Sequence, residues 1–140
     1  MSGGAVRLGG AVFCLFFVVY SLVYSPPLVA AGKEAFVKKT VATHDIVVFS
    51  KSYCPYCRRA KAVFNDLRKV PYVVELDERD DGWEIQDALS IIVGRRTVPQ
   101  VFVKGKHLGG SDDTVEAYES GKLAEILGMT TSTSSTKDDL

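Results

Sequence analysis

Cys54 and Cys57 are the residues of this sequence best suited to chemistry, because two neighbouring thiols can open and close a disulfide. They end the stretch Ser50-Lys51-Ser52-Tyr53-Cys54-Pro55-Tyr56-Cys57. Side chains three residues apart face the same side of a helix, so the two sulfurs are expected within disulfide reach. The pair therefore indicates thiol–disulfide exchange, in which one cysteine attacks and the other resolves.

A strand and a helix must position this pair. The run Ile46-Val47-Val48-Phe49 precedes it and predicts a buried strand. Apolar residues follow it at helical spacing, with charged residues between them. These apolar positions are Ala60, Val63, Phe64 and Leu67. Cys54 then falls at the helix N-cap and Pro55 at the first helical position, where a missing N–H costs nothing.

This position separates the roles of the two cysteines. The unpaired N–H groups and the dipole at a helix N-terminus favour a thiolate over a thiol. Lys51, three residues upstream, adds positive charge. Cys54 is therefore predicted to be the attacking cysteine, and Cys57, half a turn further on, the resolving one.

Two other interpretations of the pair stay open. A zinc site would need about two further ligands. The only other candidates are Cys14, His44 and His107. A purely structural disulfide would close a very short loop and would remove little entropy from the unfolded chain.

Length and composition predict one domain between two flanking segments. The chain has 140 residues, with 17 basic and 17 acidic side chains, so no charge excess indicates a nucleic-acid partner. Residues 1–31 carry a short apolar run and small residues before Gly32, as in a secretory signal peptide cleaved after Ala31. An uncleaved signal anchor is the alternative. Residues 129–140 form a Ser/Thr-rich tail, predicted to be disordered, that ends Lys137-Asp138-Asp139-Leu140, one residue from a Lys-Asp-Glu-Leu retrieval signal.

The domain of residues 32–128 contains four predicted strands and at least four helices. Helices are expected at 33–43, 55–67, 83–92 and 113–127, the last interrupted at Gly121. Strands are expected at 46–49, 72–76, 101–103 and 107–108, with 72–76 parallel to 46–49. Ser111 or Asp112 is expected to cap the last helix, and Trp83 to pack at the start of its own. The pattern predicts an α/β, thioredoxin-like fold: a four-stranded mixed sheet flanked by helices.

Three motifs at these separations resemble those of dithiol glutaredoxins of the C-P-Y-C class, above all plant forms with an N-terminal leader. They are Tyr53-Cys54-Pro55-Tyr56-Cys57, Thr97-Val98-Pro99 and Gly109-Gly110-Ser111-Asp112-Asp113. The likeness covers residues 33–128. Thioredoxin itself is less similar, because it has Gly-Pro between its cysteines and lacks the third motif. Many relatives have cysteine where this chain has Ser111.

The resemblance implies glutathione as cosubstrate and assigns residues to it. Lys51 and Gln86 would meet its glycine carboxylate, and Tyr56 would line the groove. Thr97 and Val98 would pair with its cysteinyl main chain, next to a cis Pro99. Gly110, Ser111 and Asp112 would hold its γ-glutamyl end.

The implied activity is reduction of protein–glutathione mixed disulfides and protein disulfides by a monomeric enzyme. No metal is expected, and no iron–sulfur cluster, since cluster-holding relatives mostly have a smaller residue at position 55. A thioredoxin-fold binding module or chaperone with incidental cysteines is the alternative. The leader and tail together predict the secretory pathway, either the endoplasmic reticulum lumen or secretion.

Overall fold

The computed structural model describes residues 28–129. The predicted leader up to residue 27 and the predicted tail from residue 130 lie outside the described residues. So does Cys14, one of the three candidates for a further zinc ligand. Within the described range, no helix combines the length and apolar character needed to cross a bilayer.

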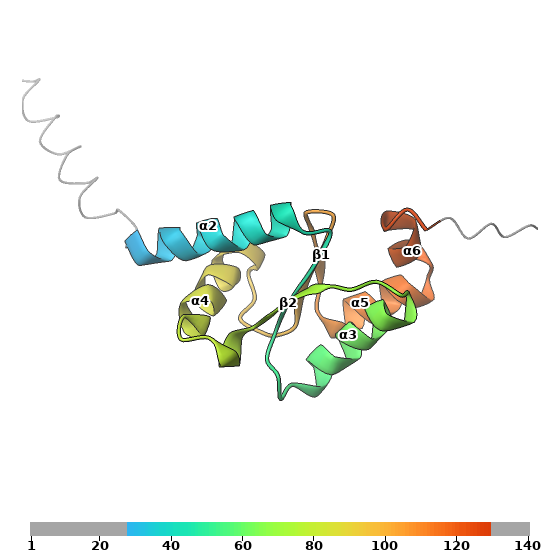
Figure 1. Ribbon diagram of the computed structural model, residues 1–140, viewed down its shortest axis with the longest axis horizontal. Helices are drawn as coiled ribbons and strands as arrows, with labels where there is room; N and C mark the ends of the chain where they lie inside the picture. The colour runs from blue at the N-terminus through green and yellow to red at the C-terminus, as the bar shows by residue number, and fades with distance from the viewer. Residues whose placement is uncertain (1–27, 130–140) are drawn as a thin grey trace, which may run out of the picture.

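The described chain folds as an α/β unit around one mixed sheet (Figure 1). Its elements in order are α2 (Leu28–Thr43), β1 (Ile46–Ser50), α3 (Pro55–Asp66), β2 (Tyr72–Glu75), the short 3₁₀ helix η1 (Leu76–Glu78), α4 (Gly82–Val93), β3 (Gln100–Val103), β4 (Lys106–Gly109), α5 (Ser111–Glu119) and α6 (Lys122–Ile126). The strand order is β2-β1-β3-β4. β1 is parallel to β2 and antiparallel to β3, which is antiparallel to β4. The predicted thioredoxin-like fold is confirmed.

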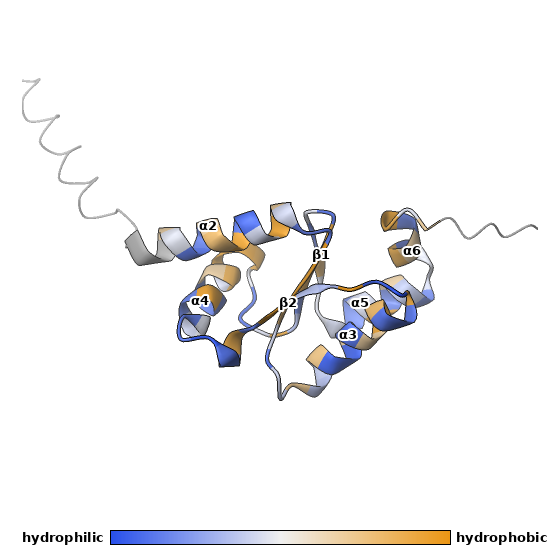
Figure 2. Cartoon of the chain, viewed as in Figure 1, coloured by the Kyte–Doolittle hydropathy of each residue, from blue (hydrophilic) through white to orange (hydrophobic). Residues whose placement is uncertain are grey.

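The central strand β1 has a core on both faces. Val47 and Phe49 point into one core with α2 and α4, whereas Ile46 and Val48 point into a second core with α3, α5 and α6. Alternate residues of a strand face opposite sides, so an uninterrupted apolar run is what a strand covered on both faces requires. Figure 2 shows this central apolar strand between helices with polar outer faces.

Three helices begin earlier than predicted, α4 by a single residue at Gly82. α2 starts at Leu28 instead of residue 33, directly after two prolines, because Ala30 and Ala31 are strong helix formers. The cleavage site predicted after Ala31 therefore lies within this helix. α5 starts at Ser111 instead of residue 113. The interruption predicted at Gly121 is confirmed, since this residue has φ 79° between α5 and α6.

Ion pairs tie α2 to the start of α4. Asp81 precedes α4 and accepts hydrogen bonds from Lys33 Nζ at 2.8 Å and from Arg79 Nε at 2.8 Å. The Arg79 guanidinium and then the Lys33 ammonium hold the pKa of the Asp81 carboxyl well below its usual range. The first turn of α4 is thus fixed from two sides.

Gly82, the first residue of α4, allows that turn to approach η1 closely. A Cβ at this position would lie 1.8 Å from the backbone oxygen of Leu76. Gly82→Ala must therefore displace backbone, and we expect it to lower the free energy of unfolding by roughly 1 to 3 kcal/mol, the usual cost of overpacking. Urea denaturation monitored by circular dichroism measures this loss.

Gly32→Ala in α2 is the matched control. A Cβ at Gly32 would have no atom within 4 Å, so this exposed helical glycine should tolerate alanine or gain stability from it. Equal denaturation midpoints for Gly82→Ala and the unsubstituted protein would contradict the close approach.

Candidate active site

The two cysteines lie at the junction of β1 and α3, as predicted. Cys54 is the N-cap of α3 and Pro55 its first residue. The Cys57 backbone N–H donates to Cys54 Sγ at 3.4 Å, so the sulfur caps the helix. The Cys54 N–H donates to the Lys51 carbonyl at 3.1 Å, which closes the turn before the helix. Both cysteines are free thiols, so the structure has the reduced form of the pair.

Cys57 is inaccessible to large reactants. Its exposed fraction is 0%, whereas Cys54 is partly exposed. Burial, and then the hydrogen bond with Cys54, raise the pKa of the Cys57 thiol to about 11. Cys57 is therefore a protonated thiol at neutral pH. Only Cys54 can meet an external disulfide.

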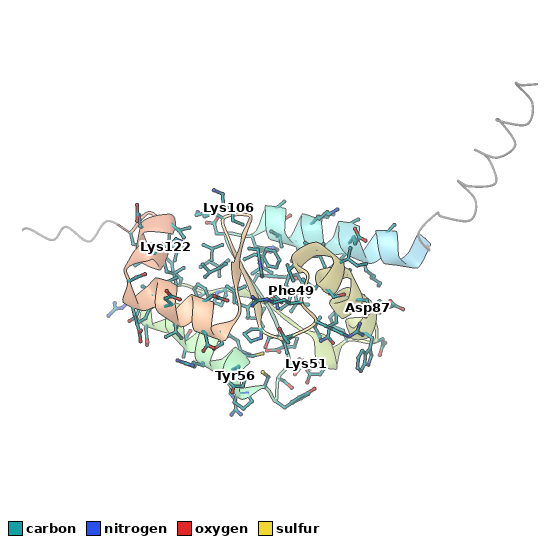
Figure 3. The ribbon with its side chains drawn as sticks, turned by 180° about the vertical axis from the view of Figure 1, so that it is seen from behind. Phe49, Lys51, Tyr56, Asp87, Lys106 and Lys122 are labelled. Atoms are coloured by element: carbon teal, nitrogen blue, oxygen red, sulfur yellow. The ribbon has the colours of Figure 1, made fainter. Side chains whose placement is uncertain are left out.

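An open pocket of about 230 Å³ adjoins the loop that leads to Cys54. Lys51, Tyr53, Asp77, Trp83 and Gln86 are among its lining residues. Gln86 is buried and donates its amide Nε2 to the Arg96 carbonyl at 2.8 Å. Figure 3 shows Lys51 and Tyr56 at the lower edge of the molecule, with Lys106 at the upper edge.

The prediction that Trp83 packs at the start of its helix is wrong. Its side chain is 69% exposed, and Lys51 Nζ lies 5.3 Å from its ring centroid. The close approach at Gly82 directs the start of α4 towards η1, while the indole remains at the pocket surface.

Asp77 fixes the loop that leads to Cys54. Its carboxylate accepts the Ser52 backbone N–H at 2.8 Å and the Ser52 hydroxyl. These two bonds, followed by the nearby Lys51 charge, lower the pKa of Asp77, while burial acts in the opposite direction. Sequence reasoning missed this residue. The available signal was its place two residues beyond β2, since parallel strands end at the same edge of a sheet.

The Thr97-Val98-Pro99 segment lies against the attacking cysteine. The Val98–Pro99 peptide bond is cis, as the resemblance implies, and the Val98 carbonyl oxygen is 4.0 Å from Cys54 Sγ. The buried Gln100 holds this segment, because its Nε2 donates to the Thr97 carbonyl at 2.9 Å.

His107 supports Gln100 from the neighbouring strand. Its Nε2 is 2.7 Å from Gln100 Oε1, which must accept because the amide nitrogen already donates to Thr97. Burial and then the Arg95 charge lower the pKa of His107, against an opposing effect of Asp113, so the imidazole is neutral near pH 7. Sequence reasoning missed both supporting residues.

The start of α5 lies against α3, the helix that Cys54 caps. Gly110, not Ser111 or Asp112, is its N-cap, so the predicted caps are wrong. The Asp113 carboxylate, from the first turn of the helix, accepts the Gly110 N–H at 2.9 Å. A side chain inside the helix therefore stabilises its N-terminus, because Gly110 has none of its own. This leaves Ser111 Oγ buried and without a hydrogen-bond partner in residues 28–129. Asp112 is exposed and pairs with Arg59 of α3 at 3.1 Å.

The histidines occupy structural positions. His44 stacks on Tyr72 with ring centroids 3.8 Å apart, and its Nδ1 lies 3.1 Å from the Thr40 carbonyl. His107 supports the cis-proline segment as described above. Across the described residues, no three His, Cys, Asp or Glu side chains gather into a group that could hold a metal ion.

This geometry defines a thiol–disulfide oxidoreductase of the thioredoxin fold. One partly exposed thiol caps a helix, a buried thiol lies three residues further on, and a cis-proline segment lies against the first. Lys51 and Gln86 line the pocket next to Tyr53, and Asp112 at the start of α5 pairs with Arg59 of α3.

Comparison with known proteins identifies the family. The glutaredoxin family model matches residues 46–108. Glutaredoxin-C8 of Oryza sativa subsp. japonica is 77% identical over 101 residues, which cover 71% of this chain and 74% of the relative. Glutaredoxin-C4 of Arabidopsis thaliana is 72% identical over 101 residues, covering 71% and 75%. The crystal structure of a buckwheat glutaredoxin–glutathione complex is similar with a TM-score of 0.71 and 39% identity, covering 74% of this chain and 94% of that one.

The chain belongs to the glutaredoxin family. It is a dithiol-type member, and its activity is that of a glutathione-dependent thiol–disulfide oxidoreductase.

Proposed function

We propose that Cys54 carries both half-reactions and that Cys57 serves only to close the internal disulfide. The Cys54 thiolate attacks the glutathione sulfur of a mixed disulfide, that S–S bond breaks, and the client thiolate leaves and takes up a proton. Cys54 is then joined to glutathione. A second glutathione thiolate attacks the glutathione sulfur of this adduct, releases glutathione disulfide and restores the Cys54 thiolate.

The alternative second step uses Cys57. Its thiol loses a proton, and the thiolate attacks the Cys54 sulfur and expels glutathione as a thiolate. Two further glutathione molecules reduce the resulting Cys54–Cys57 disulfide and leave as glutathione disulfide. Partial exposure of Cys54 and complete burial of Cys57 support this division of roles.

We assign glutathione to groups of the pocket next to Tyr53, of the cis-proline segment and of the start of α5. Lys51 and Gln86 meet its glycine carboxylate, and Tyr56 lines the groove. Thr97 and Val98 pair with its cysteinyl main chain beside the cis Pro99. Gly110, Ser111 and Asp112 take its γ-glutamyl end. The observation that carries this assignment is Ser111 Oγ, a buried hydroxyl with no partner in the described chain at the N-terminal turn of α5.

Ser111→Ala tests the γ-glutamyl end. A hydrogen bond to a charged ligand group contributes about 1.5 to 3 kcal/mol, so kcat/KM for glutathione should fall roughly tenfold or more. Stability should be unchanged or slightly higher, because the substitution removes a buried polar atom that no protein group satisfies. Steady-state kinetics coupled to glutathione reductase and a thermal melt measure the two effects.

Ser120→Ala is the matched control, since Ser120 Oγ contacts only the Ala117 carbonyl, at 3.4 Å, at the far end of the same helix. It should leave kcat/KM for glutathione unchanged. Kinetics of Ser111→Ala equal to those of the unsubstituted enzyme would remove Ser111 from the site.

We further propose that the working enzyme holds no metal or iron–sulfur cluster. Pro55 supports this, because cluster-holding glutaredoxins mostly have a smaller residue at that position. Its clients are proposed to be glutathionylated or disulfide-bonded proteins of the secretory pathway, on the strength of the apolar leader in residues 1–31. The residues assigned to catalysis and to glutathione all lie after this predicted leader, between Lys51 and Asp112.

A further inference from the structure

Trp83 lies between two cations that come from different parts of the chain. Lys51 Nζ, from the loop after β1, is 5.3 Å from the ring centroid. The Arg96 guanidinium carbon, from the loop before β3, is 5.8 Å from the same centroid. Both distances are within the range over which a cation is attracted to the face of an indole.

The indole attracts both cations. Two positive groups repel each other, and long side chains in solvent lose entropy when they are held in one place. None of the salt bridges in the described chain involves Lys51. Arg96 pairs with Asp87, one turn beyond Trp83 on the same helix α4, and this pairing holds its side chain near the indole.

The backbone around Trp83 is fixed although its side chain is exposed. Gly82 places the start of α4 against the Leu76 carbonyl, and Gln86 holds the Arg96 carbonyl at 2.8 Å. The indole therefore has a rigid base, contacts both cations, and lines the same pocket as Lys51. Structural packing does not account for an indole that is 69% exposed.

We propose that Trp83 is a positioning residue that sets the preference of this enzyme for a free carboxylate at the glycine end of glutathione. The inference rests on the proposed assignment of that carboxylate to Lys51. Trp83 acts through Lys51 and Arg96, because an indole itself offers a carboxylate only one N–H donor.

The test compares glutathione with its glycyl monoethyl ester, which lacks the carboxylate charge. With Trp83→Ala, kcat/KM for glutathione should fall about 2- to 5-fold, as expected for loss of a cation–π contact at an exposed site. The value for the ester should stay that of the unsubstituted enzyme. Trp83→Phe keeps an aromatic face and should retain most of the preference for glutathione over the ester.

Ile91→Ala is the matched control, since Ile91 is an exposed apolar residue of the same helix that does not line the pocket. It should leave both kcat/KM values unchanged. Equal losses with glutathione and ester in Trp83→Ala, or no loss with either, would overturn the inference. Equal losses with glutathione in Trp83→Phe and Trp83→Ala would also overturn it, because the ring face would not then be responsible.

The same kinetic data distinguish the proposed role of Trp83 from the proposed contact of Lys51 with the glycine carboxylate. An unsubstituted enzyme that used glutathione and the ester equally well would show that no cation meets the glycine carboxylate. The roles proposed for Lys51 and for Trp83 would then both be wrong. Clear discrimination by the unsubstituted enzyme, with unchanged discrimination in Trp83→Ala, would leave Lys51 in place and remove only Trp83.

Discussion

Replacing Cys54 with serine is expected to abolish turnover of glutathione mixed disulfides, and replacing Cys57 with serine is expected to preserve it. The Cys54 sulfur caps α3 and is partly exposed, so it alone can attack an incoming disulfide. Cys57 is fully buried and enters only the closure of the internal disulfide. Activity of Cys54→Ser should fall to the uncatalysed background, because a serine hydroxyl without an activating base is too weak a nucleophile at neutral pH.

The measurement is reduction of a glutathionylated peptide by glutathione, with NADPH and glutathione reductase. A protein disulfide serves as the second substrate, and its reduction should fall sharply in Cys57→Ser because the resolving thiol is missing. Each variant is the control for the other, since both replace a sulfur by an oxygen at the start of α3. A Cys57→Ser enzyme without deglutathionylating activity would reverse the proposed roles.

Closure of the Cys54–Cys57 disulfide should accelerate with pH, by up to about tenfold for each pH unit above neutrality, because only the thiolate attacks. Burial is the largest cause that raises the pKa of Cys57 to about 11. The direction follows from the sign of this shift: a raised pKa keeps Cys57 protonated at neutral pH, and its thiolate fraction grows until the pH passes that value. The hydrogen bond with the Cys54 thiol disappears when Cys54 is glutathionylated, but burial remains.

Rapid-mixing release of glutathione from enzyme already glutathionylated at Cys54 would measure closure directly. Near neutral pH, where Cys57 is protonated, closure should compete poorly with attack by free glutathione on the Cys54 adduct. Alkaline conditions should favour the internal disulfide. Cys57→Ser enzyme should release no glutathione by this route at any pH. A rate that stops rising near pH 8 would show that Cys57 ionises far more readily than its burial indicates.

The sequence alone determined the elements that carry the cysteines. The apolar run from Ile46 to Phe49 predicted β1, and Pro55 after Cys54 predicted the start of α3. Both signals act between residues that are close in the chain, so periodicity and capping rules were sufficient. The motifs around Cys54, Val98 and Gly110 added the fold and the family, because three local patterns had to occur at fixed separations.

The tertiary structure alone decided which side chains meet around those cysteines. Asp77 reaches Ser52 across 25 residues, and Gln100 holds Thr97 with support from His107 on the next strand. The cap of α5 was wrongly predicted because serine and aspartate at its start both fit the rule, and only the backbone geometry selects Gly110.

The exposure of the Trp83 side chain was also decided by tertiary structure. An apolar side chain at a helix start usually packs inward, yet the close approach at Gly82 and the position of Lys51 leave this ring at the pocket surface. Local sequence specifies which backbone conformations are low in free energy. The partners of a side chain depend on how separate elements dock, and that follows from the packing of both cores against β1.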